Sequence, residues 1–397
     1  MAQPKVAVGI DIGTYHVKVV IASRSADGRQ PPRILGTGYA ESRGMRRGYT
    51  VSIAETSRAV RAAVAQAQGA ARIKVTSAYL GLSDEGLDET TGRGEAVVER
   101  GDSIISQRDM DRALDASQAA LPPARTQNQR IIHRIPLRWS VDGVKVLGKD
   151  PSGMKGMRLA VETLFVVAPE KHVADLTDAV EQAGIEVEDV IAGPLAASFV
   201  TLTKTQKRVG SVLVGLGAET LSMAVFEDDA PISMKVFPTG ASDIASDLAL
   251  GLKIPLEEAE QLKMGAVLGS PHPKKKVDDI THKRIIAMFK PLEAHLKKIG
   301  KDELLPAGIV ITGGGANIPT LAHNVQAIMR LPTRVGAPIS ETGSTQLRDG
   351  SWSVAYGLTV WGLMSRDETE PRDHGSMGEA FGDVFSGTLK FFKKFLP

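Results

Sequence analysis

The sequence predicts an α/β fold built from two related lobes. In residues 8–19, VGIDIGTYHVKV, an apolar strand meets a glycine-containing turn and continues as alternating residues. Residues 212–223, VLVGLGAETLSM, repeat this pattern about two hundred residues later. Strand, helix and turn patterns recur after the second copy, and 397 residues are enough for two or more domains.

The composition is that of an ordinary soluble globular protein, with 42% apolar and 24% charged residues. A formal net charge of +2 argues against a general nucleic-acid binder, so no nucleic-acid partner is expected. The chain has no cysteine, which excludes disulfides, thiolate metal sites and cysteine nucleophiles. The N-terminus lacks the pattern of a signal peptide, and no apolar run is long enough to span a bilayer, so we expect a cytosolic chain.

The first half begins with strands at residues 5–10 and 17–21, joined by an Asp-Ile-Gly-Thr turn. A helix is expected at residues 52–68, because Ser52 and Glu55 have the spacing of a capping box. Residues 83–94 are rich in Gly, Asp, Glu and Thr, which predicts a loop that leads into an inserted unit.

The inserted unit is expected to contain one short strand, one helix and two extended runs. The strand is expected at residues 95–99, and the helix begins at the pair Ser106 and Asp109. The extended runs are expected at residues 131–141 and 143–147. The chain then returns through a long strand at residues 159–167 and a helix at residues 170–183, which ends at Gly184.

Three glycine-containing turns point to phosphate chemistry, because their backbone N–H groups converge and glycine lets oxygens approach closely. The first carries Asp11, Gly13 and Thr14, and Asp11 is suited to orient water around Mg²⁺. The alternative for this turn is an ordinary hairpin with glycine at a positive φ. The third, GIVITGGGANIPTLAHNV at residues 308–325, is a strand, three glycines and a helix expected to begin near Pro319.

Between the second and third turns, the predicted helix PLEEAEQLKMGA carries Glu260 and Lys263 on one face. Alone this is a solvated ion pair, worth only about 0.3–0.5 kcal/mol. The alternative is that both side chains hold a ribose and a base. In this order, the three turns and the pair match the actin/Hsp70/hexokinase nucleotide fold.

The expected nucleotide-binding residues come from all four segments. They are Asp11, Gly13, Thr14, Tyr15, His16, Lys18, Gly215, Gly217, Thr220, Gly240, Glu260, Lys263, Gly313, Gly314 and Gly315, with Asp11 as the metal residue. No catalytic residue is assigned.

Together with the segments between them, these motifs resemble the bacterial cell-division protein family FtsA along essentially the whole chain. VGIDIGT is similar to its first phosphate loop, and SRGMRRG, residues 42–48, to the signature after its second strand. IIHRIPLRWSVDG and DPSGMKGMRL resemble its own small domain, 1C, which contributes to filament contacts in that family. GLKIPLEEAEQLK and AGIVITGGGANIPTLA are similar to its adenosine-binding segments.

The resemblance implies an actin-like fold of duplicated ribonuclease-H-like domains with a 1C insertion and a C-terminal amphipathic helix. The implied subdomains are 1A (1–83, 163–207 and 346–366), 1C (84–162), 2A (208–251 and 306–345) and 2B (252–305), followed by a linker (367–379) and the terminal helix (380–397).

The resemblance also implies a function. Such a protein binds ATP with Mg²⁺ between its lobes, polymerises into filaments, anchors FtsZ polymers to the cytoplasmic face of the membrane at the division septum, and recruits later division proteins. Two alternatives share the fold: a pilus-assembly scaffold of the PilM type, and a sugar or carboxylate kinase. The kinase would need a catalytic base and a substrate pocket, and the PilM type lacks an amphipathic tail.

Both phosphate loops depart from the family pattern. The second reads Gly215, Leu216, Gly217, Ala218, Glu219, Thr220 where family members usually have Asp-Ile-Gly-Gly-Gly-Thr. If Glu219 faced a phosphate oxygen at about 4 Å, the repulsion would be about 4 kcal/mol, whereas pointing into solvent would cost nothing. In the first loop, Tyr15 and His16 replace a small residue and a lysine, and Lys18 either supplies the charge or is solvated. Any ATPase activity is therefore expected to be weak, and the nucleotide to hold the lobes together.

A basic segment lies where the family's domain 2B receives the FtsZ tail. PHPKKK, residues 271–276, is expected as an exposed loop, followed by a helix at residues 281–299. The expected FtsZ-tail residues are Lys283, Arg284, Lys290 and Lys297. A solvated helix face is the alternative; the functional interpretation is a basic groove for an acidic-hydrophobic peptide.

After a polar linker, the sequence AFGDVFSGTLKFFKKFLP has the pattern of a helix that lies in a membrane interface. Its expected membrane-binding residues are Phe381, Val384, Phe385, Leu389, Lys390, Phe391, Phe392, Lys393, Lys394, Phe395 and Leu396. The lysines favour anionic lipids. The alternative is a helix docked on the protein's own surface.

Overall fold

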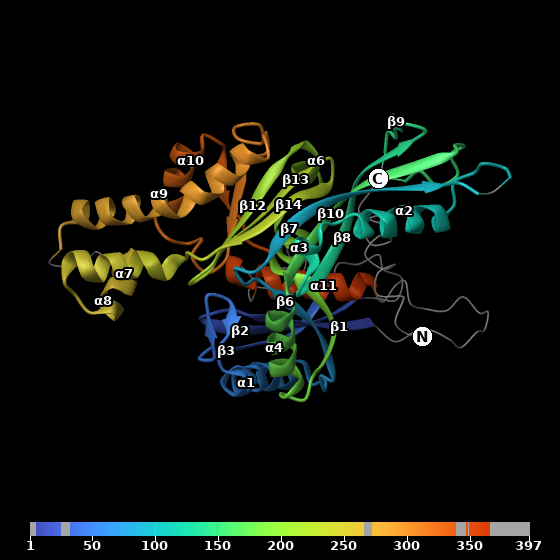
Figure 1. The fold of residues 1–397 in the computed structure, drawn as a ribbon. Helices are drawn as coiled ribbons and strands as arrows, with labels where there is room; N and C mark the ends of the chain where they lie inside the picture. The colour runs from blue at the N-terminus through green and yellow to red at the C-terminus, as the bar shows by residue number, and fades with distance from the viewer. Residues whose placement is uncertain are drawn as a thin grey trace.

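The computed structural model describes residues 5–24, 32–99, 101–148, 150–265, 272–338, 347 and 349–365. Figure 1 shows two lobes with a third unit beside them. The first-lobe sheet contains β1 (Lys5–Ile12), β2 (His16–Arg24), β3 (Arg33–Glu41), β6 (Ser77–Leu82) and β11 (Glu186–Ala192). The second-lobe sheet contains β12 (Ser211–Leu216), β13 (Leu221–Glu227), β14 (Ala230–Phe237), β15 (Ile309–Thr312) and β16 (Thr333–Val335).

The two sheets have the same topology. Their strand orders are β3-β2-β1-β6-β11 and β14-β13-β12-β15-β16. In each, the first three strands pair antiparallel and the last three parallel. This shared order confirms the predicted α/β fold of two duplicated, actin-like lobes.

Helices α1 (Ile53–Ala71) and α4 (Glu170–Glu181) lie on the outer side of the first-lobe sheet, at the bottom of Figure 1. The Ser52 hydroxyl accepts a hydrogen bond from the Glu55 N–H at the start of α1, as the sequence predicts. Beyond α4, Gly184 has a left-handed φ of 87°, which confirms the predicted end of that helix.

Two helices pack in the centre, α5 (Gly193–Thr201) and α11 (Ser353–Ser365). Their contact is close because of glycine: a Cβ at Gly357 would lie 1.9 Å from the Ala196 carbonyl oxygen. A Cβ at Gly9 of β1 would likewise lie 2.2 Å from the Ala355 carbonyl oxygen. These glycines bring α11 against both the first-lobe sheet and α5, while the short helix α6 (Lys204–Val209) leads into the second lobe.

The second lobe carries α7 (Ala241–Leu252), α8 (Leu256–Lys263), α9 (Lys274–Lys298) and α10 (Leu321–Met329). The prediction of a basic loop was wrong at Lys274–Lys276, because these exposed lysines form the first turn of α9. Pro273 is the N-cap of α9, a position where the missing N–H of proline costs no intrahelical hydrogen bond. Val277 is buried, so the apolar face of α9 begins N-terminal to the predicted start of the helix. Helix α10 begins two residues after Pro319, at Leu321.

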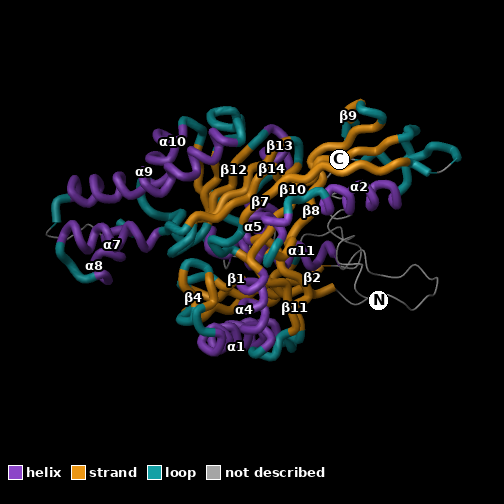
Figure 2. The backbone as a smooth tube through the Cα atoms, in the orientation of Figure 1, coloured by secondary structure: helices purple, strands orange, loops and turns teal. Residues whose placement is uncertain are grey.

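The inserted unit is a four-stranded sheet in the order β7-β10-β8-β9, covered by α2 (Gln107–Ala119). Figure 2 shows it extending beside the second lobe. Its other elements are β7 (Asp88–Val97), α3 (Pro123–Thr126), β8 (Gln129–Val141), β9 (Val144–Lys145) and β10 (Arg158–Pro169).

Two expectations for this unit change. Residues 88–94 belong to strand β7 and not to a loop, because Gly92 and Gly94 give α2 room to pack. A Cβ at Gly94 would lie 2.2 Å from the Ala113 carbonyl oxygen of α2. Strand β10 also spans the expected boundary at residues 162 and 163, and its register with β8 shifts at that point.

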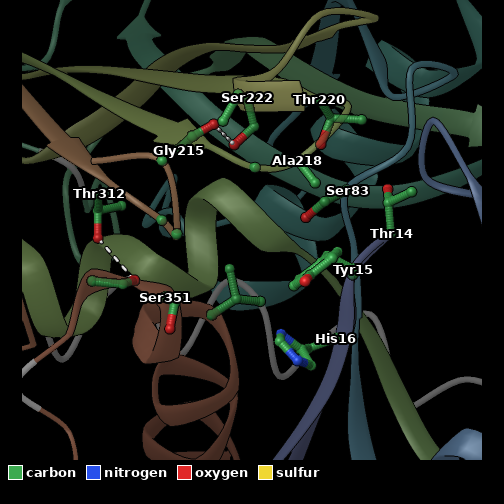
Figure 3. A pocket seen from close by; sticks show the side chains of 18 of the residues that line it. Thr14, Tyr15, His16, Ser83, Gly215, Ala218, Thr220, Ser222, Thr312 and Ser351 are labelled. Carbon is green, nitrogen blue, oxygen red and sulfur yellow. Dashed lines mark hydrogen bonds between the residues drawn. The ribbon is translucent and has the colours of Figure 1, made fainter. Parts of the chain in front are cut away.

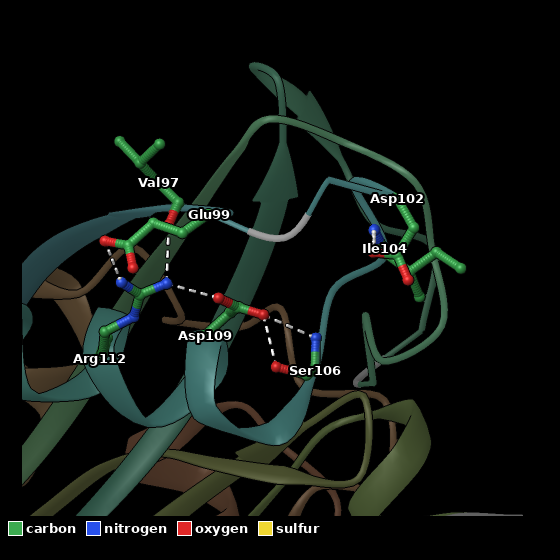
Figure 4. A network of polar contacts seen from close by, with 7 residues as sticks. All are labelled: Val97, Glu99, Asp102, Ile104, Ser106, Asp109 and Arg112. Atoms are coloured by element: carbon green, nitrogen blue, oxygen red, sulfur yellow. Dashed lines mark hydrogen bonds and ion pairs between the residues drawn. The ribbon is translucent and has the colours of Figure 1, made fainter.

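Helix α2 begins at the capping box that Ser106 and Asp109 predict (Figure 4). Asp109 Oδ2 accepts the Ser106 N–H at 2.8 Å and the Ser106 hydroxyl at 2.6 Å. Arg112 contacts the same carboxylate at 2.6 Å and Glu99 at 2.6 Å, and donates to the Val97 carbonyl. Hydrogen bonds from Ser106 and Arg112 hold the pKa of Asp109 below its usual value, against the effect of burial.

The inserted unit contacts both lobes through side-chain acceptors. In the first lobe, the Ala192 N–H donates to Nε2 of buried His133 at 3.0 Å. In the second, Glu89 accepts the Met234 N–H of edge strand β14 at 2.5 Å. In both cases a side chain of the insertion satisfies a backbone donor of the lobe.

The predicted linker at residues 367–379 and amphipathic helix at 380–397 lie outside the described residues. Within the described ranges, no helix combines the length and apolar character needed to cross a bilayer.

Candidate functional site

A cavity of about 380 Å³ lies between the two lobes (Figure 3). All but one of the expected nucleotide-binding residues line it: Asp11, Gly13, Thr14, Tyr15, His16, Lys18, Gly215, Gly217, Thr220, Glu260, Lys263, Gly313, Gly314 and Gly315. Segments that are up to three hundred residues apart thus meet at one place.

The first loop is a tight turn between β1 and β2. The Gly13 N–H donates to the His16 carbonyl at 3.1 Å, and Asp11 stands opposite Lys18 in the strand register. Burial raises the pKa of Asp11, while Lys18 lowers it. Because Lys18 lines the cavity, its ammonium is available to a ligand there, which favours the first of the two roles expected for it.

Tyr15 and His16 extend from the same loop toward the cavity in Figure 3. The His16 ring contacts Tyr15 edge-on at 4.6 Å and Tyr39 at 5.8 Å, measured between ring centroids. Burial, with a smaller effect of Lys18, lowers the pKa of His16. The ring is therefore mostly neutral at pH 7, and Lys18 is the cationic residue of this loop that lines the cavity.

The second loop is closed by the Gly217 N–H, which donates to the Thr220 carbonyl at 2.8 Å. Its carboxylate does not face the cavity. Glu219 Oε2 accepts the backbone N–H of Arg47, in the first lobe, at 2.6 Å. The carboxylate is thus bonded to the backbone of the other lobe, an orientation that was not considered from the sequence.

Gly240, the remaining predicted ligand contact, does not line the cavity. Its role is packing: a Cβ there would lie 2.3 Å from the Ala218 carbonyl oxygen and 2.6 Å from the Glu219 nitrogen. The absence of a side chain at Gly240 lets the start of α7 support the second loop. The Ser242 N–H donates to the Ala218 carbonyl at 2.8 Å.

The third loop follows β15 and turns at Gly313, whose φ of 92° favours glycine. The Gly313 N–H and the Thr312 hydroxyl both donate to the Gly350 carbonyl, at 3.2 and 3.1 Å. At Gly314 an added Cβ would meet only the Ser351 Cβ, at 3.8 Å. The Gly314 backbone therefore borders open space, which suits a flat group laid against it.

Glu260 and Lys263 form the predicted ion pair on α8. Lys263 is only 8% exposed, whereas a solvated pair would leave the lysine in water. Both side chains line the cavity. The burial of Lys263 and the position of both residues at the cavity favour a role in ligand binding over the solvated alternative.

Residues of the segment before α11 were not predicted, although Asp349, Gly350, Ser351 and Ser353 line the cavity. The Asp349 carboxylate accepts the Ser351 N–H at 3.0 Å and the Ser351 hydroxyl at 2.9 Å. The sequence Asp-Gly-Ser-Trp-Ser carries this turn signal, but nothing in it indicates proximity to the other loops. Ser83, which follows β6, and Pro194, in the first turn of α5, were also missed.

Comparisons with known proteins agree with this arrangement. A family model described as cell division protein FtsA matches residues 212–357, and one described as the SHS2 domain inserted in FtsA matches residues 90–167. Together they cover more than half of the chain. The chain belongs to the FtsA family.

Curated FtsA relatives match nearly the full length. The cell division protein FtsA of Pseudomonas aeruginosa is 28% identical over 386 residues, covering 92% of this chain and 91% of its own. FtsA of Neisseria meningitidis is 29% identical, covering 98% and 97%. FtsA of Bacillus subtilis is 28% identical, covering 88% and 82%.

Solved structures share the fold at low identity. A chain of the PilM-PilN type IV pilus biogenesis complex matches with a TM-score of 0.65 and 17% identity, covering 92% of this chain and 99% of that one. The ethanolamine utilization protein EutJ of Carboxydothermus hydrogenoformans matches with a TM-score of 0.54 and 15% identity, covering 91% of both chains. These likenesses concern the fold alone.

The FtsA-like cavity has no preformed metal cage in the described part of the chain, where no three His, Asp or Glu side chains converge. Mg²⁺ needs none, because it keeps several waters and is bound through one or two carboxylates plus phosphate oxygens. Asp11, at the cavity wall, can therefore serve as a single carboxylate near the metal.

The residues expected to meet the FtsZ tail lie on α9 of this FtsA family member. Arg284 makes a bidentate ion pair with Asp247 of α7, at 2.6 Å for both contacts, and so holds the two helices together. Lys297 pairs with Glu293 at 2.5 Å. Lys283 and Lys290 are exposed and seven residues apart, so they lie on the same helix face.

Proposed function

We propose that this FtsA family member is an actin-like protein that anchors FtsZ polymers to the cytoplasmic face of the membrane at the division septum. In this proposal it forms nucleotide-stabilised filaments and recruits later division proteins. The observation that carries the nucleotide part is the single cavity in which all three glycine loops meet the Glu260–Lys263 pair.

The proposed ligand is ATP with Mg²⁺. The bare backbone at Gly13 and Gly217 and the ammonium of Lys18 would hold the phosphates. Glu260 and Lys263 would hold the ribose and base, which would lie against Gly314. Bound Mg²⁺ would neutralise phosphate charge, with Asp11 orienting its water shell.

We propose further that the nucleotide holds the lobes together and is turned over slowly or not at all. Glu219, the carboxylate of the second loop, faces Arg47 and not the cavity, and Gly215 stands where the family usually has Asp. The second loop therefore offers no carboxylate to activate water. Fast ATP turnover by the purified protein would contradict this.

Nucleotide binding is tested by equilibrium dialysis of the purified protein against ATP and Mg²⁺. We expect Lys263→Ala to weaken binding by at least about tenfold, since it removes a charged contact. Lys283→Ala, which removes the same charge from exposed α9, is the matched control and should bind like the parent. Equal affinity of all three proteins would refute the cavity as the ATP site.

For the FtsZ tail, we propose an electrostatic contact with Lys283 and Lys290 of α9. A peptide with the acidic-hydrophobic character of that tail should bind the parent, and bind Lys290→Ala more weakly, most clearly at low salt. Lys145→Ala in the inserted unit removes an equally exposed lysine and should have no effect. Salt-independent binding that both variants retain would exclude this helix face.

Membrane attachment rests on the amphipathic sequence at residues 381–396. Removal of the residues after Ala380 should leave a folded protein that no longer sediments with vesicles of anionic phospholipid. Sedimentation of the truncated protein with those vesicles would place the anchor elsewhere.

A further inference from the structure

The hydrogen bond between Glu219 and Arg47 joins the two lobes at the edge of the cavity. Glu219 belongs to the second loop, and Arg47 to the hairpin of β4 (Met45–Arg46) and β5 (Tyr49–Thr50) on the first lobe. The contact joins segments 172 positions apart. Gly48 and Ala218, the neighbours of the two bonded residues, both line the cavity.

The donor side of this bond is held firmly on the first lobe. A Cβ at Gly44 would lie 2.3 Å from the Thr56 hydroxyl of α1, and one at Gly48 would lie 2.6 Å from the Asp84 Cα. The Ser42 N–H also donates to the Tyr15 carbonyl at 3.0 Å, which ties this segment to the first phosphate loop. The hairpin therefore cannot follow Glu219 if the second lobe moves away.

Backbone conformation also orients the donor. Arg47 has a left-handed φ of 49°, and Gly48 follows with a φ of 84°. Arg47 contributes its backbone N–H to the bond, so its side chain is not needed for the contact. The left-handed conformation is the kind that glycine adopts without strain.

The acceptor side is equally supported. The Ala241 N–H donates to the Gly217 carbonyl at 2.9 Å, and Gly240 packs against the backbone of Ala218 and Glu219. The second loop is thus fixed on the start of α7. Since both partners are preorganised on separate lobes, their bond joins the lobes at the edge of the cavity.

We propose that Glu219 is an interlobe latch, whose bond to the Arg47 N–H keeps the lobes closed when the cavity holds no nucleotide. Opening the mouth to admit or release a ligand requires this bond to break. The proposal concerns the free protein and does not depend on which ligand the cavity binds or on the proposed function.

The chain has no cysteine, so a pair of spin labels can be attached to two introduced cysteines without first removing native ones. One label replaces Val51, which is 63% exposed and follows the hairpin, and the other replaces Leu250, which is 80% exposed on α7 of the second lobe. Pulsed electron paramagnetic resonance then measures the distance distribution between the labels in nucleotide-free protein.

The parent should give one short distance. In Glu219→Ala a longer distance should appear, with the ratio of open to closed molecules raised about tenfold, as expected for loss of a hydrogen bond to a charged group. Glu219→Ser, whose hydroxyl is too short to reach Arg47, should open in the same way and replaces the alanine variant if that one does not fold.

Two controls separate the bond from general charge effects. Arg47→Gly keeps the N–H donor and suits the left-handed backbone, so it should remain closed. Glu257→Ala removes an exposed carboxylate from the same lobe and should also remain closed. An unchanged distance in the Glu219 variants, or opening of Arg47→Gly to the same extent, would overturn the proposal.

Discussion

His133 links the inserted unit to the first lobe, and its ionisation gives a measurable pH dependence of stability. The imidazole is 2% exposed, and Nε2 accepts the Ala192 N–H at 3.0 Å, so the proton of the neutral ring is on Nδ1. The Trp361 ring lies 5.8 Å away between centroids. Protonation of Nε2 would replace this hydrogen bond by two facing donors.

Burial lowers the pKa of His133 from 6.5 to about 3. Because the folded pKa lies below the unfolded one, the unfolded chain binds more protons between these values. The stabilisation is therefore complete above pH 6.5 and is lost as the pH falls toward 3. Between pH 7.5 and 5.5 this one group should lower the free energy of unfolding by about 1.4 kcal/mol.

The assay is urea-induced unfolding, followed by tryptophan fluorescence, at pH 7.5 and 5.5. His133→Gln is the matched variant, because its Oε1 can accept the Ala192 N–H but does not titrate. The parent should lose about 1.4 kcal/mol more than the variant over this interval, whatever the other histidines contribute to both. If both proteins lose the same stability, His133 is not a neutral buried acceptor and the reasoning fails.

Three further substitutions test the packing and the joints of the fold. Gly357→Ala should lower the free energy of unfolding by about 1–3 kcal/mol, because its Cβ would lie 1.9 Å from the Ala196 carbonyl oxygen; an unchanged melting temperature would contradict this close contact. Gly69→Ala in α1, where a Cβ meets nothing within 4 Å, should instead stabilise by about 0.5–1 kcal/mol, and a lower melting temperature would argue against that open space. Glu89→Ala should cost about 1–3 kcal/mol and speed hydrogen exchange of the Met234 amide, whereas an equally protected amide would show that Glu89 is not its acceptor.

Local sequence signals predicted much of the fold. Apolar periodicity identified the paired strands of both lobes, and the Ser106–Asp109 pair identified the start of α2. The exceptions have local causes. Gly92 and Gly94 suggested a loop, yet in β7 they are the positions where α2 needs space, so strand pairing and helix packing outweighed their low strand propensity.

The sequence predicted residues of the ligand cavity only in those loops that carry a recognisable local sequence pattern. Glycine turns after apolar strands and an acid–base pair on a helix gave fewer than half of the lining residues, although all but one of the predicted residues do line the cavity. The segment at Asp349–Ser353 was missed, because its turn signal is local and only the packing of α11 brings it to the cavity. Gly240 is the one predicted residue that does not line the cavity, because glycine beside a loop has the same sequence signal whether it faces a ligand or supports backbone.

The hydrogen bonds that join the two lobes and the inserted unit could not have been predicted from the sequence, and the reason is physical. At three joints a side chain of one part accepts a backbone N–H of another: Glu219 from Arg47, Glu89 from Met234, and His133 from Ala192. Every residue except proline carries such a donor, so the sequence does not indicate which residue donates the hydrogen bond. On the donor side every substitution except proline keeps the N–H, whereas any change that removes an acceptor such as Glu219 alters the joint between the lobes.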